Sequence, residues 1–284
     1  MIMKKMMLIA LLAAVPVGLF CQDYVPTKDD LARFPKTKTL VVLEDNPLSE
    51  YNMTLKEVMP TEWTMTPYDF ISWKEFETKR MDPALSFIIM TQVKYDKDKS
   101  NAKYNYMSLL LGGKGVTINN MPDLCPIPLS YSGVGDDDYS YKLGIFIRFM
   151  QKHVKLLMEN PSIASENILK YYNKNISNMK GKTLYLVAKE MAKEVNTEPK
   201  IKKIYSGAIK LVSKDDIKQA IADKKDIVFL HKVGPESTKF KARCFKILIG
   251  ADDANFYYFD YHIVDDDSPD GFLAKDFKKL PKVK

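Results

Sequence analysis

The sequence predicts an α/β protein made of two tandem repeats, each with a mixed sheet in which parallel strands come first and antiparallel strands last. The main observation is a stretch that occurs twice, at residues 68–90 and 209–231. Each copy reads as a short apolar strand, a helix that begins with an S-x-x-E or S-x-x-D capping box, and a second buried strand. The copies match without a gap at an offset of 209 − 68 = 141.

Strands on either side of this stretch extend the repeat. Residues 39–43 match 183–187 at an offset of 144, and residues 103–111 match 242–249 at an offset of 138. The falling offset indicates two three-residue deletions in surface connections, where changes of length are tolerated. Strands that alternate with helices favour parallel pairing, and strands that are joined by short turns favour an antiparallel edge.

The expected order in each repeat is β-α-β-α-β-β-β-α. The helix after the first strand is predicted at residues 50–59 and, with an interruption near Pro199, at 190–203. The last strand is predicted at 116–129 and 255–264, and the final helix at 141–159 and 272–280. The helix at 141–159 is apolar on more than one side, so we expect it to pack between the halves. The predicted parts are a lead-in (22–38), repeat 1 (39–138), a helical connector (139–178) and repeat 2 (179–284).

Residues 1–21 read as a signal peptide that directs export to the periplasm or the cell envelope. Two lysines form a positive start, and the apolar run at residues 8–20 is shorter than a membrane-spanning helix. Cys21 could carry a lipid anchor, but the residues before it lack the small side chain that such processing needs, which favours cleavage after Cys21. No later stretch of the sequence is apolar and long enough to span a membrane.

Composition and charge are those of a globular protein with a lysine-rich second half. Of the 284 residues, 46% are apolar and 28% are charged. Without the signal peptide the net charge is 41 − 36 = +5, divided into −2 over residues 22–159 and +7 over residues 160–284. Arg243 is the only arginine of the second part, which disfavours nucleic acid and favours a solvated lysine surface. An acidic partner or an anionic surface is the alternative.

Three further features have both a chemical and a structural interpretation. Export would permit a disulfide between Cys125 and Cys244, but their positions in predicted strands of different halves favour two buried thiols. The glycine loop at residues 112–115 leads into a strand-like segment, which favours a turn over a phosphate loop. The acidic triplets at 136–138 and 265–267 precede helices and lack the EF-hand spacing, which favours capping over calcium binding.

Four residues are candidates for a binding site. Trp73 directly follows the capping Ser72, where an exposed indole would suit a partner or glycan surface, but a tryptophan that closes the core edge is favoured. Asp260 and His262 share one strand face, and with His231 they could form a metal or acid/base site in repeat 2, but structural histidines are favoured. No nucleophile has a triad or elbow context. We therefore predict no catalytic residue, no cofactor and no metal ligand set.

The order strand–helix–strand, S-x-x-E helix, strand–strand over residues 39–111 and 183–249 resembles the α/β unit at the amino terminus of TolB and in CsgG. The whole layout resembles exported two-repeat α/β proteins of Gram-negative anaerobes. The resemblance implies a periplasmic, non-catalytic interaction module and carries no functional residue. We expect an exported, non-enzymatic binding or scaffold protein of the cell envelope, with a protein or envelope partner. The alternative is a hydrolase or metal-dependent enzyme with a site around Asp260, His262 and His231.

Overall fold

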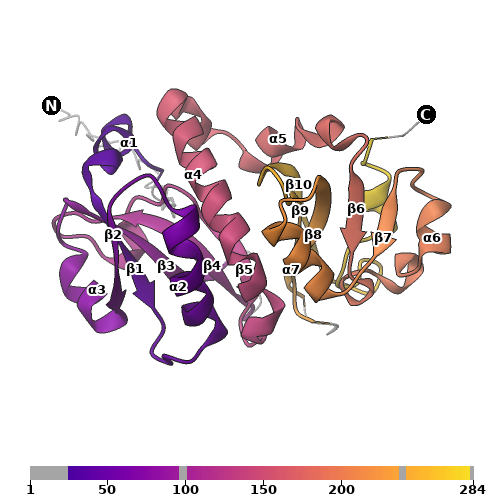
Figure 1. Ribbon diagram of the computed structural model, residues 1–284, viewed down its shortest axis with the longest axis horizontal. Helices are drawn as coiled ribbons and strands as arrows, with labels where there is room; N and C mark the ends of the chain where they lie inside the picture. The colour runs from indigo at the N-terminus through magenta and orange to yellow at the C-terminus, as the bar shows by residue number, and fades with distance from the viewer. Residues whose placement is uncertain (1–24, 96–100, 237–240, 282–284) are drawn as a thin grey trace, which may run out of the picture.

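The computed structural model describes residues 25–95, 101–236 and 241–281. The predicted signal peptide and Cys21 lie outside the described residues, as does the start of the lead-in. The fold contains two five-stranded sheets with the same strand order, β2-β1-β3-β4-β5 and β7-β6-β8-β9-β10 (Figure 1). In each sheet the first three strands are parallel and the last two are antiparallel. The predicted α/β class with mixed sheets is confirmed, and the two similar sheets are compatible with a two-repeat layout.

The first sheet has a helix on each face. Ser72 caps the second of these helices as predicted, because its Oγ accepts from the Glu75 amide at 3.3 Å and the Glu75 carboxylate accepts from the Ser72 amide at 2.9 Å. The elements of this half are α1 (Lys28–Arg33), β1 (Lys38–Leu43), α2 (Glu50–Glu62), β2 (Tyr68–Ser72), α3 (Trp73–Lys79), β3 (Leu85–Lys94), β4 (Lys103–Leu111) and β5 (Ile127–Tyr131).

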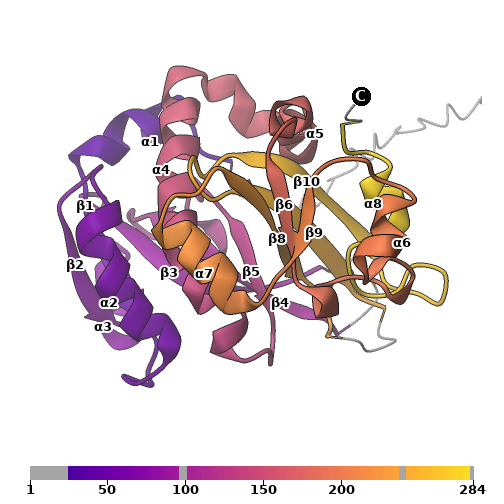
Figure 2. The ribbon, with the colours of Figure 1, turned by 45° about the vertical axis from the view of Figure 1, so that its right-hand side comes forward.

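The second sheet is covered by shorter helices. Its elements are β6 (Thr183–Leu186), α6 (Glu198–Lys202), β7 (Ile209–Leu211), α7 (Lys214–Ala222), β8 (Ile227–Val233), β9 (Arg243–Gly250), β10 (Phe256–Ile263) and α8 (Ala274–Phe277). The helix predicted at 190–203, with an interruption near Pro199, forms only over its last part. The chain forms the 3₁₀ turns η8 (Ala188–Glu190) and η9 (Lys193–Val195) before α6 begins, with Pro199 in its first turn. Proline is tolerated there but not in a helix interior. The predicted helix at 272–280 is reduced to α8, which lies beside α6 (Figure 2).

The predicted strand at 116–129 is also wrong over most of its length. Residues 112–126 form a loop with the 3₁₀ turn η3 (Ile118–Asn120), in which Asp123 makes one isolated antiparallel bridge to Leu110 of β4, and the regular strand is confined to β5. Proline cannot donate to a strand ladder, and Pro122 and Pro126 interrupt this segment. The glycine loop at 112–115 is a turn as predicted, with Gly115 at a φ of 71°.

The two sheets do not keep the sequence offsets along their strands. Phe87 of β3 pairs with Leu110 of β4, and Val228 of β8 pairs with Gly250 of β9. Phe87 and Val228 are 141 positions apart, but their partners are 250 − 110 = 140 positions apart, whereas the sequence predicted 138 for β4 and β9. The faces differ as well. Phe87 packs against Phe76 of α3. Its counterpart 141 positions later, Val228, lies in a buried cluster that, among the described residues, contains no side chain of α7. Because β3 and β8 are apolar on both faces, a one-residue shift leaves no trace in their sequences.

One hydrophobic core runs through both halves. The long helix α4 (Leu143–Glu159) lies between the two sheets, as the connector was predicted to do (Figure 1). Its Phe149 ring stacks on Phe256 of β10 with centroids 3.5 Å apart, and Tyr104 of β4 packs edge-on against Phe245 of β9. These residues belong to the same buried cluster. The halves therefore share this core, and each half has in addition a smaller buried cluster of its own. In the part of the chain that the structure describes, no helix has the length and hydropathy needed to cross a membrane.

Candidate binding site

An open crevice lies at the carboxyl edge of the first sheet. In α/β sheets, ligands bind beyond the carboxyl ends of the strands, at the point where successive connections leave in opposite directions. That point lies between β1 and β3 here, because β1 has β2 on one side and β3 on the other. The crevice has a volume of ≈ 280 Å³ and is lined by residues 42–45 at the end of β1, Trp73, residues 89–92 of β3 and Asn105 of β4.

Trp73 forms one wall of this crevice. It is the first residue of α3, directly after the capping Ser72. Its indole packs against Phe76 at 5.3 Å, and Phe76 is buried against Phe87 at 5.0 Å. The residue as a whole is 39% exposed. The structure thus places a partly exposed indole in the wall of this crevice.

The crevice is negatively charged. Glu44 and Asp45 follow β1 directly and line it. Burial raises the pKa of the Glu44 carboxyl, and the charges of Asp136 and Asp45 raise it further, although a hydrogen bond from Ser49 opposes them. Within the described residues, none of these three carboxylates forms an ion pair with a lysine or arginine. The part of the chain that the structure describes therefore supplies no compensating cation to the acidic end of the crevice.

Polar groups on the strands complete the lining. Asn105 donates its side-chain amide to the Ser130 hydroxyl at 2.9 Å, and Gln92 donates to the Ser132 hydroxyl at 3.2 Å. These bonds orient both amides through their nitrogens, so their carbonyl oxygens are the atoms that can accept from a ligand. The lining combines an aromatic face, carboxylates and amide acceptors, a set that suits a cationic or hydrogen-bond-donating group.

The corresponding crevice of the second half is filled by the chain itself. The occupant is the segment of η4 (Asp136–Asp138) and η5 (Ser140–Lys142), between the first sheet and α4. Lys214, the first residue of α7, pairs with Asp137 at 3.0 Å and also contacts Asp138. Lys189, which follows β6, pairs with Asp138 at 3.2 Å. The first acidic triplet therefore binds lysines of the other half, and the prediction that it caps a helix is wrong.

His231 lies behind this segment, at the contact between the halves. It is buried, its Nε2 donates to the Pro128 carbonyl at 2.9 Å, and its Nδ1 lies 3.4 Å from the Lys142 ammonium. Burial and the Lys142 charge hold the pKa of His231 well below its usual range. Burial alone would lower the pKa of Lys142, but Glu190 at 3.7 Å and Tyr141 raise it overall. A neutral His231 accepting from a charged Lys142 is a structural arrangement that joins β8, β5 and η5.

Asp260 and His262 lie on the opposite face of the second sheet from His231. Asp260 pairs across the ladder with Lys246, whereas His231 pairs with Ile247, and neighbouring residues of one strand point to opposite faces. The Asp260 carboxylate contacts Lys279 at 2.5 Å, and His262 Nε2 donates to the Pro269 carbonyl at 3.0 Å. The three residues of the alternative enzyme site are not brought together. Among the described residues, no group of three or more His, Cys, Asp or Glu side chains could hold a metal ion.

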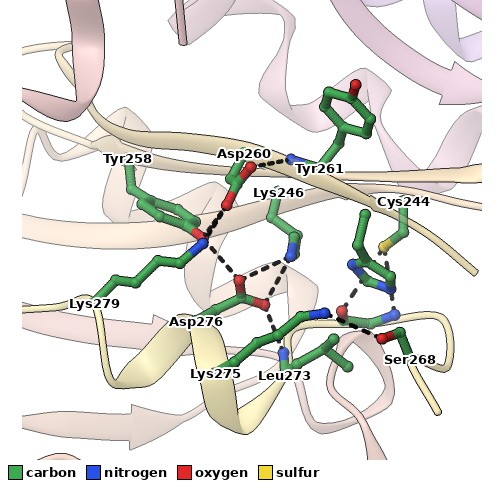
Figure 3. A network of polar contacts seen from close by, with 12 residues as sticks. Cys244, Lys246, Tyr258, Asp260, Tyr261, Ser268, Leu273, Lys275, Asp276 and Lys279 are labelled. Carbon is green, nitrogen blue, oxygen red and sulfur yellow. Dashed lines mark hydrogen bonds and ion pairs between the residues drawn. The ribbon is translucent and has the colours of Figure 1, made fainter. Parts of the chain in front are cut away.

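A buried polar network occupies this outer face and fastens α8 to the sheet (Figure 3). The Lys246 ammonium lies 2.8 Å from both carboxylate oxygens of Asp276, and the Tyr258 hydroxyl donates to Asp276 at 2.7 Å. Cys244 lies nearby and is a free, buried thiol, as is Cys125. The two cysteines are therefore unpaired, as the sequence favoured. The second acidic triplet forms its own turn, in which Asp265 accepts from the amide of Ser268 at 2.7 Å.

The histidines make stability depend on pH. Burial lowers the pKa of His153 from 6.5 to about 4, and its Nδ1 accepts from the Tyr172 hydroxyl at 2.6 Å. Because the pKa of His153 is lower in the folded than in the unfolded chain, protonation favours unfolding. The contribution of neutral His153 to the free energy of unfolding is therefore complete above about pH 6.5 and is lost as the pH falls towards 4. From pH 7.5 to 4.5 we expect His153 to account for roughly 2–3 kcal/mol of the fall in unfolding free energy.

Urea unfolding at both pH values measures this contribution. Between pH 7.5 and 4.5, the free energy of unfolding should fall by roughly 2–3 kcal/mol less in His153→Gln than in the natural chain. Equal losses in the two proteins would contradict the assignment. The pKa values of His231 and His262 shift in the same direction, so the variant should keep part of the dependence.

Sequence reasoning singled out Trp73 but missed Glu44 and Asp45, which share the crevice with it. Their position directly after the first parallel strand was the available signal, since that edge of an α/β sheet is where ligands bind. Asn105 and Gln92 left no such signal, because the fold alone brings β3 and β4 to the crevice. No family model, no curated protein and no solved structure matches the chain, so the site is defined by its geometry alone.

Proposed function

We propose that this chain is an exported, non-enzymatic binding or scaffold protein of the cell envelope, and that it binds its partner at the crevice beside Trp73. The observation that carries the proposal is the open crevice of ≈ 280 Å³ at the carboxyl edge of the first sheet, with a partly exposed indole as one wall. Accessible tryptophans contribute strongly to binding, because they provide a large apolar surface with few rotatable bonds.

Export and the non-enzymatic role are supported by the sequence. Residues 1–21 have the charge and length pattern of a secretory signal. No serine or cysteine has the context of an activated nucleophile. The resemblance to the α/β units of TolB and CsgG points to the same kind of interaction module. The alternative enzyme would need Asp260, His262 and His231 to converge, and they lie on two faces of one sheet.

Replacing Trp73 by alanine tests the proposal. The purified protein, immobilised and exposed to a periplasmic extract of the native cells, should retain a partner that the Trp73→Ala variant binds about 30-fold more weakly, as for an interface hot spot. Met81→Ala is the matched control, because it removes another exposed apolar side chain, 45% accessible, from the same half. Equal retention by the two variants would refute the crevice as the binding site. Hydrolysis of an ester, phosphate or glycoside panel that is lost in His262→Ala would favour the enzyme instead.

A further inference from the structure

The two crevices occupy the same place in their sheets but carry opposite charge. In the second half, Lys189 follows β6 and Lys214 is the first residue of α7. In the first half, Asp45 follows β1 and Trp73 is the first residue of α3, the helix that corresponds to α7. Glu44 adds a second carboxylate to the first crevice. Equivalent positions therefore present ammonium groups in one half and carboxylates with an indole in the other.

The filled crevice shows what this edge of the fold accommodates. Its occupant is a turn-rich chain segment, residues 136–142, that inserts side chains of both charges. Asp138 pairs with Lys189 and Lys214 at the rim. Lys142 reaches further in, where it is 1% exposed and lies 3.7 Å from Glu190. The edge of this sheet can thus hold a peptide segment through ion pairs between lysine and carboxylate side chains.

We propose that the crevice of the first half binds a segment of a partner protein that carries a lysine or arginine, with the cation over the Trp73 indole and facing Glu44 and Asp45. This inference rests on the proposed function and names the chemistry of its partner. An indole face attracts an ammonium or guanidinium group, and nearby carboxylates complete the charge pairing. The carbonyl oxygens of Gln92 and Asn105 can accept its remaining N–H groups.

The size and charge of the site select this occupant. A volume of ≈ 280 Å³ lies just below the roughly 300–1,000 Å³ typical of pockets for drug-sized ligands, so it suits one long side chain and its flanking backbone. An acidic segment such as residues 136–138 would be repelled by Glu44, Asp45 and Asp136. Within the described residues these three carboxylates have no ion pair of their own, so a cationic side chain gains their attraction without displacing an internal partner.

Calorimetry with designed peptides tests the inference. The probe is a blocked heptapeptide with the sequence of residues 136–142 in which lysine replaces each aspartate and glutamate replaces the lysine. The unchanged acidic heptapeptide and N-acetyl-lysine amide are the comparison ligands. The basic peptide should bind, its Kd should rise about tenfold in the Glu44→Gln/Asp45→Asn variant, and the binding should weaken with added salt.

The matched control variant is Glu57→Gln/Asp215→Asn, which removes the same charge from exposed positions outside the crevice and should leave the Kd unchanged. Equal losses in the two double variants, or equal binding of the acidic peptide, would overturn the inference. Saturation by N-acetyl-lysine amide with the Kd of the peptide would overturn the peptide part. Self-association that the crevice variant abolishes would identify a second copy as the partner and overturn the inference too.

Failure of the inference can be distinguished from failure of the proposed function. If the captured partner is lost with Trp73→Ala but unaffected by Glu44→Gln/Asp45→Asn, the binding function stands and the cationic partner is refuted. If capture is indifferent to Trp73→Ala while the basic peptide still requires Glu44 and Asp45, the cation site stands and the proposed partner surface is refuted.

Discussion

Replacing Lys246 by methionine is expected to lower the free energy of unfolding by about 3–5 kcal/mol, because the change leaves the Asp276 carboxylate buried without its cation. The two side chains are 1% and 0% exposed, and the ammonium contacts both carboxylate oxygens at 2.8 Å. Asp276 also accepts from Tyr258 and from the Leu273 amide at the start of α8. These remaining bonds hold the carboxylate in place, so it cannot turn towards solvent (Figure 3).

Urea unfolding followed by circular dichroism measures the loss, and a double-mutant cycle with Asp276→Asn isolates the pair. We expect a coupling energy well above the roughly 0.5 kcal/mol within which independent sites add. Lys202→Met is the comparison, because Lys202 and Glu198 form an exposed pair on α6 at 3.9 Å. That variant should change stability by less than about 1 kcal/mol. Similar effects at Lys246 and Lys202 would show that burial of the first pair does not matter.

Phe149→Ala should destabilise the whole chain by about 3–5 kcal/mol, the usual loss for a buried phenylalanine. Phe149 lies on α4, is 5% exposed, stacks on Phe256 of the second sheet and packs beside Tyr172 of α5 (Ile168–Asn173). Because the core is continuous between the sheets, the variant should still unfold in one cooperative transition that involves both halves. Calorimetry measures both quantities, the stability and the number of transitions.

Met158→Ala is the matched control on the same helix, since Met158 is 38% exposed. It should change stability by less than about 0.5 kcal/mol, as surface substitutions usually do. Two separate transitions in the Phe149→Ala protein would show that each half has a sufficient core of its own. The structure would then be two loosely docked domains, contrary to the shared cluster.

Part of the candidate site could be predicted because it depends on neighbours along the chain. Trp73 was recognised because the capping box of Ser72 and Glu75 places it on the first, accessible turn of a helix. The carboxylates Glu44 and Asp45 needed the sheet order before their place at the carboxyl edge had meaning. The histidine site in repeat 2 failed for a similar reason. Asp260 and His262 share a face, but the pairing of three strands decides that His231 lies on the other.

The α/β class, the capped helices and the long apolar helix between the halves could be predicted from the sequence, because they follow from interactions within about four residues and from periodicity. Which of the two crevices is open depends on how the sheets pack together. Lys214 meets Asp137 across 77 positions, and His231 meets Lys142 across 89. Such pairs form where two sheets pack together, and no local pattern records them. The same packing decides which face of β8 points to the shared core, because a strand that is apolar on both faces can bury either face there.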